Sequence, residues 1–183
     1  MSDIMNLSSV DFIIDHNDIY LSHEHSSFMS LFHIRIDKSI YPNRRYKGLP
    51  LLTLSYFIKE LRLLISKENT INERHIYFYP ETTNFIKFKL IDNETVLLEF
   101  VQRKNSAKNI IQSIFSKDGR LESSIVYCQF NELFVVLYKT AETLINRLNN
   151  RKEHGGDFYA LEYQVRLAKS LFNKLVVTIN DKG

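Results

Sequence analysis

Residues Ser27 to Ile36 alternate between two kinds of side chain, and this alternation is the strongest constraint on the fold. In an extended chain one face carries Phe28, Ser30, Phe32, Ile34 and Ile36, and the other carries Met29, Leu31, His33 and Arg35. A strand that is largely apolar on one side buries that side against other elements. The sequence therefore predicts one long strand with a buried face.

Several other short runs are typical of strands. Val10 to Ile14 and Ile19 to Leu21 flank His16-Asn17-Asp18, whose residue types favour a turn, so we expect an opening hairpin. Further strands are predicted over Arg74–Tyr79, Phe85–Ile91, Thr95–Val101, Ile110–Phe115 and Leu121–Gln129. Lys87 and Lys89 alternate with apolar residues, so one face of this part of the sheet is expected to meet water.

Three segments have helical periodicity. After Pro50, apolar residues recur at spacings of three and four from Leu54 to Ile65. A second helix is predicted from about Asn131 to Leu148. A third is expected to begin at Asp157, a good N-cap, and to fray after Val176, so that about 177–183 form a tail.

Together these elements predict an α+β fold in one globular domain over residues 1–183. We expect a largely antiparallel sheet of about five to seven strands, with three helices packed mainly on one face. The strand and helix order lacks the βαβ alternation of a doubly wound nucleotide-binding fold.

The composition indicates the cellular compartment of the protein. The single cysteine, Cys128, cannot form an intramolecular disulfide, so a reducing compartment is expected. Asp3 stands where a secretory signal carries Lys or Arg, and no apolar run reaches the length of a signal peptide or a membrane span. We therefore expect a cytoplasmic protein that does not bind membranes.

His16, His23 and His25 form the richest cluster of potential ligands. Two imidazoles separated by one residue on a strand share a face, and a third ligand could complete a metal site for a small metal-dependent enzyme. The surrounding polar stretch is typical of a solvated loop, which is the interpretation we favour, and the spacing matches no specific metal motif. Our prediction assigns no metal site and no cofactor, and keeps the metal-dependent enzyme as an alternative.

No other pattern points to catalysis. Cys128 lies within an apolar run, where a thiol behaves as a small hydrophobic group, and no activating partner can be named. The five glycines form neither a dinucleotide-binding nor a P-loop motif. We therefore predict a non-enzymatic protein with no catalytic residues.

The distribution of charge favours a protein partner over nucleic acid. The net charge is only +3, although Lys87, Lys89, Arg103 and Lys104 leave a nucleic-acid-binding module as a further alternative. Residues 1 to 40 hold six acidic and two basic residues, a charge of −4, so the rest of the chain carries +7. We predict that Asp15, Asp18 and Glu24 present an acidic patch to a partner protein.

Tyr46-Lys47-Gly48-Leu49-Pro50-Leu51-Leu52-Thr53-Leu54 contains a Gly-x-Pro-Leu-Leu entry into an amphipathic helix. This segment, following N-terminal strands, resembles small bacterial immunity proteins of polymorphic-toxin and contact-dependent growth inhibition systems. The likeness covers mainly residues 9 to 66. It implies a cytoplasmic protein that binds and neutralises one cognate toxin domain, and it transfers no catalytic or binding residue to this chain.

Overall fold

The computed structural model describes residues 7–42, 46–66, 73–78, 84–103, 121–151 and 154–181. These residues form two antiparallel sheets and three helices, which confirms the predicted α+β class. One sheet has five strands and the other has four, instead of the single sheet expected. The predicted strand over Ile110–Phe115 and its turn at Lys117–Gly119 lie outside the described residues.

The first sheet is built around β3 (Ser27–Ile36), which carries the alternation seen in the sequence. The strands β1 (Val10–Ile14), β2 (Tyr20–Ser22), β4 (Ser39–Tyr41) and β5 (Lys47–Gly48) all pair with β3 in antiparallel fashion. At the two ends of β3, Ser26 and Asp37 have positive φ values of 49° and 50°, where the chain turns sharply into and out of the strand.

The expected opening hairpin between β1 and β2 is wrong. Both strands pair with β3, at Ile14↔Phe32 and at Tyr20↔Met29 respectively, and therefore run in the same direction. Asp15 to Ile19 bulge out between them, and the Asp15 amide donates to the carbonyl oxygen of Leu31 at 2.9 Å. The turn-forming residues thus make a bulge within a long hairpin, and the hairpin reverses at residues 23–26.

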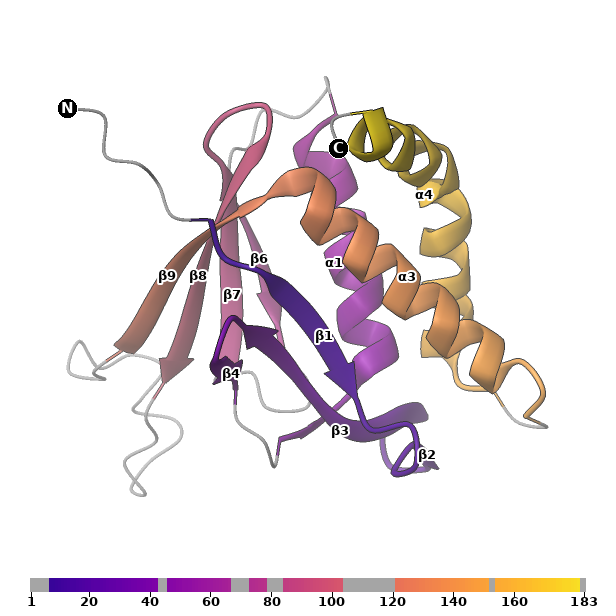
Figure 1. Ribbon diagram of the computed structural model, residues 1–183. Helices are drawn as coiled ribbons and strands as arrows, with labels where there is room; N and C mark the ends of the chain where they lie inside the picture. The colour runs from indigo at the N-terminus through magenta and orange to yellow at the C-terminus, as the bar shows by residue number, and fades with distance from the viewer. Residues whose placement is uncertain are drawn as a thin grey trace, which may run out of the picture.

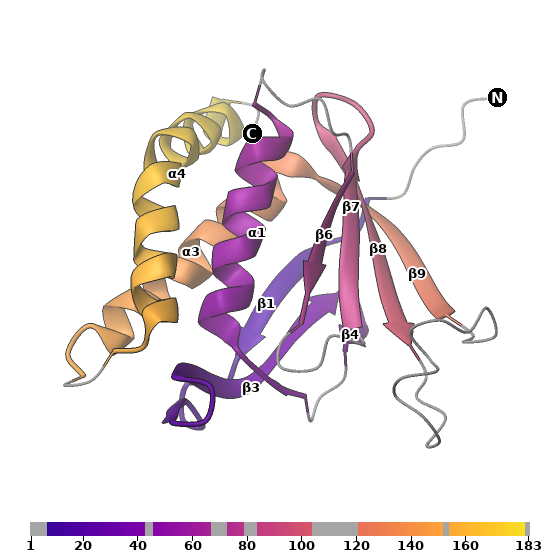
Figure 2. The same ribbon diagram turned by 180° about the vertical axis from the view of Figure 1, so that it is seen from behind.

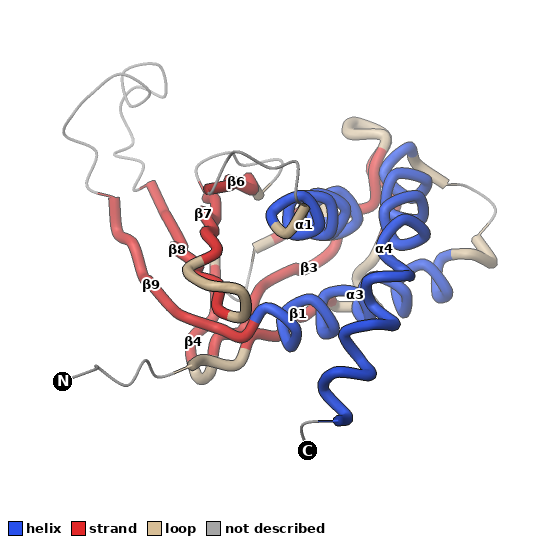
Figure 3. The backbone as a smooth tube through the Cα atoms, turned by 90° about the horizontal axis from the view of Figure 1, so that it is seen from above, coloured by secondary structure: helices blue, strands red, loops and turns tan. Residues whose placement is uncertain are grey.

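The second sheet has the order β6-β7-β8-β9. Its strands are β6 (Glu73–Tyr77), β7 (Asn84–Leu90), β8 (Thr95–Arg103) and β9 (Leu121–Gln129). Ile76, Ile86, Phe88, Leu98 and Phe100 project from its inner face and are buried. The three helices lie to one side of this sheet, as Figure 1 and Figure 3 show.

The helices are α1 (Pro50–Leu64), α3 (Phe130–Leu148) and α4 (Gly156–Asp181). Pro50 occupies the first turn of α1, as predicted. The expected fraying after Val176 is wrong, because α4 continues to Asp181. Leu171, Phe172 and Leu175 pack against the core, and Phe172 stacks on Tyr138 of α3 at 4.1 Å between ring centroids, which stabilises the later turns of α4.

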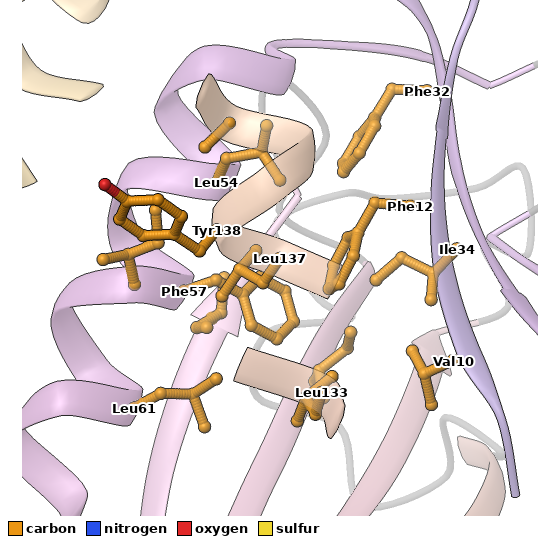
Figure 4. Packing of buried hydrophobic residues seen from close by; sticks show 14 of the residues in the cluster. Val10, Phe12, Phe32, Ile34, Leu54, Phe57, Leu61, Leu133, Leu137 and Tyr138 are labelled. Atoms are coloured by element: carbon orange, nitrogen blue, oxygen red, sulfur yellow. The ribbon is translucent and has the colours of Figure 1, made fainter. Parts of the chain in front are cut away.

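One cluster of buried side chains joins both sheets and all three helices. Figure 4 shows Val10, Phe12 and Ile34 of the first sheet facing Phe57 and Leu61 of α1 and Leu133 of α3. The Phe12 and Phe57 rings meet edge to face at 5.4 Å between centroids. Helix α1 lies between β6 and α4 (Figure 2), so its side chains are buried from several directions. No helix in the described segments is both long and apolar enough to cross a membrane.

A substitution at Gly155, just before α4, tests how closely that helix packs against the first sheet. A Cβ at this position would lie 2.6 Å from both the Ser26 carbonyl oxygen and Asp157 Oδ1. We expect Gly155→Ala to lower the free energy of unfolding by about 1–3 kcal/mol, as overpacking does. Chemical denaturation followed by circular dichroism measures this change.

Gly156→Ala is the matched control. Nothing lies within 4 Å of a Cβ at Gly156, and Gly156 is the first residue of α4. Its replacement should leave stability unchanged or raise it by up to about 1 kcal/mol. Equal effects at the two glycines would contradict the close approach at Gly155.

Candidate partner-binding surface

The three acidic residues proposed to bind a partner have different environments in the structure. Asp15 is half-buried in the bulge, where its carboxylate accepts the Asn17 amide at 2.9 Å. Asp18 forms an ion pair with Lys47 of β5 at 3.1 Å. Glu24 lies exposed in the turn between β2 and β3. Two of the three carboxylates are therefore engaged within the chain, and Glu24 is the one presented to solvent at a protruding turn.

The histidines of the same segment are not gathered into a metal site. His16 is half-buried in the bulge, and burial, with Arg147 nearby, lowers the pKa of its imidazole. His23 and His25 lie in the turn that carries Glu24. Within the described ranges, no three His, Cys, Asp or Glu side chains lie close enough to hold a metal ion. The geometry therefore gives the metal-dependent enzyme no assembled centre among these residues.

Cys128 lies on the inner face of β9, buried at 3% exposure. Burial, and to a smaller extent the nearby Glu132 carboxylate, raises the pKa of its thiol to about 12. A thiol with such a pKa is almost entirely protonated at neutral pH. Cys128 is therefore held in its unreactive form.

The basic residues considered for nucleic acid do not form an unbroken positive face. Lys87 pairs with Glu99 of β8 at 3.3 Å, and Lys89 lies exposed on the same outer face of the second sheet. Arg103 ends β8, and Lys104 lies outside the described residues. The ion pair at Lys87 removes part of the positive charge that a single-strand-binding surface requires.

The turn that carries Glu24 is attached to the beginning of α4. Asp157 Oδ2 accepts the backbone amide of Phe28 at 2.9 Å, and Oδ1 accepts the amide of Phe158 at 3.0 Å. The Arg151 guanidinium lies over the Phe28 ring at 5.6 Å from its centroid. Together with the close approach at Gly155, these contacts fix the end of the β2–β3 hairpin against α4.

The outer side of α4 carries a row of exposed apolar side chains next to this attachment. Tyr159, Tyr163 and Leu167 are 59%, 49% and 40% exposed and follow one another at intervals of four residues, so they share one face. The Arg166 guanidinium lies 5.5 Å from the centroid of the Tyr163 ring. His154 packs against Tyr159 at 6.0 Å between ring centroids. We call Glu24, Tyr159, Tyr163 and Leu167 the tip surface.

Sequence reasoning missed this row. The helix was recognised from its buried stripe, which includes Leu161, Val165 and Ala168. The sequence also contains a second set of large apolar residues, Tyr159, Tyr163 and Leu167, on the opposite side of the same helix. Their spacing of four residues could have indicated an apolar face. The sequence alone could not show that this face is uncovered, since another element of the chain could have packed on it.

Asp157 makes the attachment of the hairpin dependent on pH. Burial raises the pKa of its carboxyl above the ordinary value of an aspartate, although three backbone hydrogen bonds act in the opposite direction. A carboxyl that binds its proton more tightly in the folded state contributes stability at low pH and loses that contribution as pH rises through its folded pKa. Asn at this position cannot ionise.

We therefore expect the stability advantage of the unmodified protein over Asp157→Asn to shrink as pH rises from about 3.8 towards neutrality. Urea denaturation of both proteins at several pH values measures the difference. If the free energies of unfolding of the two proteins change in parallel with pH, or if the advantage of the unmodified protein grows as pH rises, burial does not determine the pKa of Asp157.

The reactivity of the Cys128 thiol tests whether the inner face of the second sheet is buried. At pH 8 the native thiol should react with a small disulfide reagent at least about a hundredfold more slowly than in denaturant, because little thiolate is present and the side chain is buried. The released thiolate is followed by absorbance. Comparable rates in the two conditions would contradict the burial of β9.

No known protein family, curated protein or solved structure is matched by this chain at a significant level.

Proposed function

We propose that this chain is a non-enzymatic protein-binding domain, and more specifically an immunity protein that binds and neutralises a cognate bacterial toxin domain in the cytoplasm. The observation that carries the proposal is the exposed apolar row on α4 beside the protruding turn at Glu24. Tyrosine and arginine are the residue types that most often dominate binding energy at protein interfaces. The tip surface supplies two tyrosines, with Arg166 against one of them.

The tip surface is also well suited to binding without rearrangement. Its tyrosines project from a regular helix, and a tyrosine ring offers large contact area with few rotatable bonds to restrain. Asp157 and Gly155 hold the neighbouring turn against the same helix. A partner therefore meets a preformed surface, which lowers the entropy cost of association.

The chemistry of the tip surface describes the partner that it fits. An apolar depression on the toxin would receive Tyr163 and Leu167, and a basic side chain beside it would face Glu24. The Gly-x-Pro-Leu-Leu segment contributes to the resemblance but not to this contact, because Pro50 and Leu51 are buried in the first turn of α1. The support from the resemblance and the support from the surface are thus separate.

The direct experiment uses the toxin domain encoded beside the gene of this chain. Co-expression should restore growth of cells that produce the toxin domain, and the purified pair should form a complex by calorimetry. Tyr163→Ala should weaken the complex by at least about tenfold, the typical loss at an interface hot spot. Growth protection should fall in parallel.

Tyr77→Ala is the matched control, because Tyr77 is 38% exposed on the second sheet, away from α4. It should leave affinity within about twofold of the unmodified protein. If Tyr163→Ala and Tyr77→Ala weaken the complex equally, α4 is not part of the interface. The absence of any complex with the neighbouring toxin domain would remove the proposed function itself.

A further inference from the structure

A cavity of about 370 Å³ lies between the β3–β4 hairpin and the second sheet. Ile36, Ile40 and Tyr41 form the wall on the hairpin side, and Phe100 of β8 and Val126 of β9 form the opposite wall. Asp37 and Lys38, in the turn between β3 and β4, border the same space. Its walls are thus apolar, and its charged groups come from one turn.

The cavity is held open by fixed contacts between its two walls. The Tyr41 hydroxyl lies 3.1 Å from the Phe85 carbonyl oxygen and 2.5 Å from that of Val101, and so donates towards the ends of β7 and β8. Its ring packs edge to face against Phe100 at 4.9 Å between centroids. The hairpin is therefore anchored to the second sheet at Tyr41, and the neighbouring space is part of the folded structure.

The two charged side chains of the turn, Asp37 and Lys38, differ in their hydrogen bonds and ion pairs. Asp37 accepts the backbone amide of Ser9 at 3.0 Å and the Ser9 hydroxyl at 3.3 Å. Lys38 is exposed, and within the described segments it has no hydrogen bond or ion pair. The group at the border of the cavity that can accept a new ionic partner is therefore the Lys38 ammonium.

We propose that this cavity binds a small apolar carboxylate, with the hydrocarbon part between Tyr41, Phe100 and Val126 and the carboxylate at Lys38. At about 30 Å³ for each water-sized group, the volume holds about twelve such groups, which is room for the ten or so non-hydrogen atoms of an eight-carbon fatty acid. Apolar walls with one polar group that orients the ligand are the usual design of small-molecule sites. A cationic ligand fits less well because Asp37 is already engaged by Ser9.

Octanoate, octanol and octylamine test the proposal on the full chain, because they share a hydrocarbon part and differ in the head group. Calorimetry should show saturable binding of octanoate at least fivefold tighter than that of octanol, and octylamine should bind more weakly still. Amide and methyl chemical shifts should move at Ile40 and Val126 and remain unchanged on the outer side of α4.

Two variants separate the head group from the hydrocarbon part. Lys38→Gln should remove the preference for octanoate over octanol and leave octanol binding within about twofold. Lys89→Gln, which changes an exposed lysine on the outer face of the second sheet, should preserve the preference. Val126→Phe should fill the cavity and weaken octanoate and octanol by at least tenfold.

The proposal is overturned if octanoate shows no saturable binding, if it binds no more tightly than octanol, or if Lys38→Gln leaves the preference intact. Shifts confined to another part of the protein would also overturn it. Should Val126→Phe fail to fold, the comparison between Lys38→Gln and Lys89→Gln still decides the result. None of these outcomes depends on the binding of a toxin domain.

Discussion

The burial of one face of β3 is the interaction on which the rest of the structure depends. Phe28, Phe32 and Ile34 are at most 1% exposed, and each such side chain contributes about 1.5–3 kcal/mol on burial. Because side chains alternate along a strand, a shift of one residue in pairing would turn this whole face towards solvent. The register of β3 with its four partner strands is therefore strongly specified, and so is the position of everything attached to its two ends.

The electrostatics of the N-terminal segment follow from the same pairing. The charge of −4 over residues 1 to 40 predicts an acidic patch, but the sheet places Asp11 2.6 Å from Arg35, and Asp18 beside Lys47. The Asp11 and Arg35 side chains are 40% and 52% exposed, so their pairing adds little stability. Its consequence is for recognition, since a partner meets fewer unpaired carboxylates than the sequence indicates. For this reason the proposed interface is based on the tyrosines of α4 and not on the number of acidic residues in the N-terminal segment.

Local patterns were sufficient to predict the three helices and the longer strands, but not the short strands β4 and β5, and long-range packing decided where the predictions were wrong. The periodicity of α1 and the alternation in β3 depend on which residues are apolar, so both could be recognised from sequence. Asp15 to Ile19 have the residue types of a turn, but a bulge uses the same types, and only the pairing of β2 with β3 distinguishes them. The continuation of α4 to Asp181 likewise depends on a distant partner, the Tyr138 ring against Phe172. The cavity has no local signal, because its walls come from the β3–β4 hairpin and from β8 and β9, which are far from that hairpin in sequence.

The tip surface and the cavity lie at opposite ends of β3. Ser26, beside the α4 attachment, precedes the strand, and Asp37, at the cavity, follows it. A strand of 10 residues spans roughly 33 Å at about 3.3 Å per residue, so a small carboxylate in the cavity lies far from the turn at Ser26 and from the start of α4 attached to it. Any influence of one site on the other must pass through β3 or the core beneath it, and a densely packed core resists small continuous displacements. The physical expectation is therefore that the two proposed sites are independent, so that octanoate leaves the affinity for the proposed toxin partner unchanged.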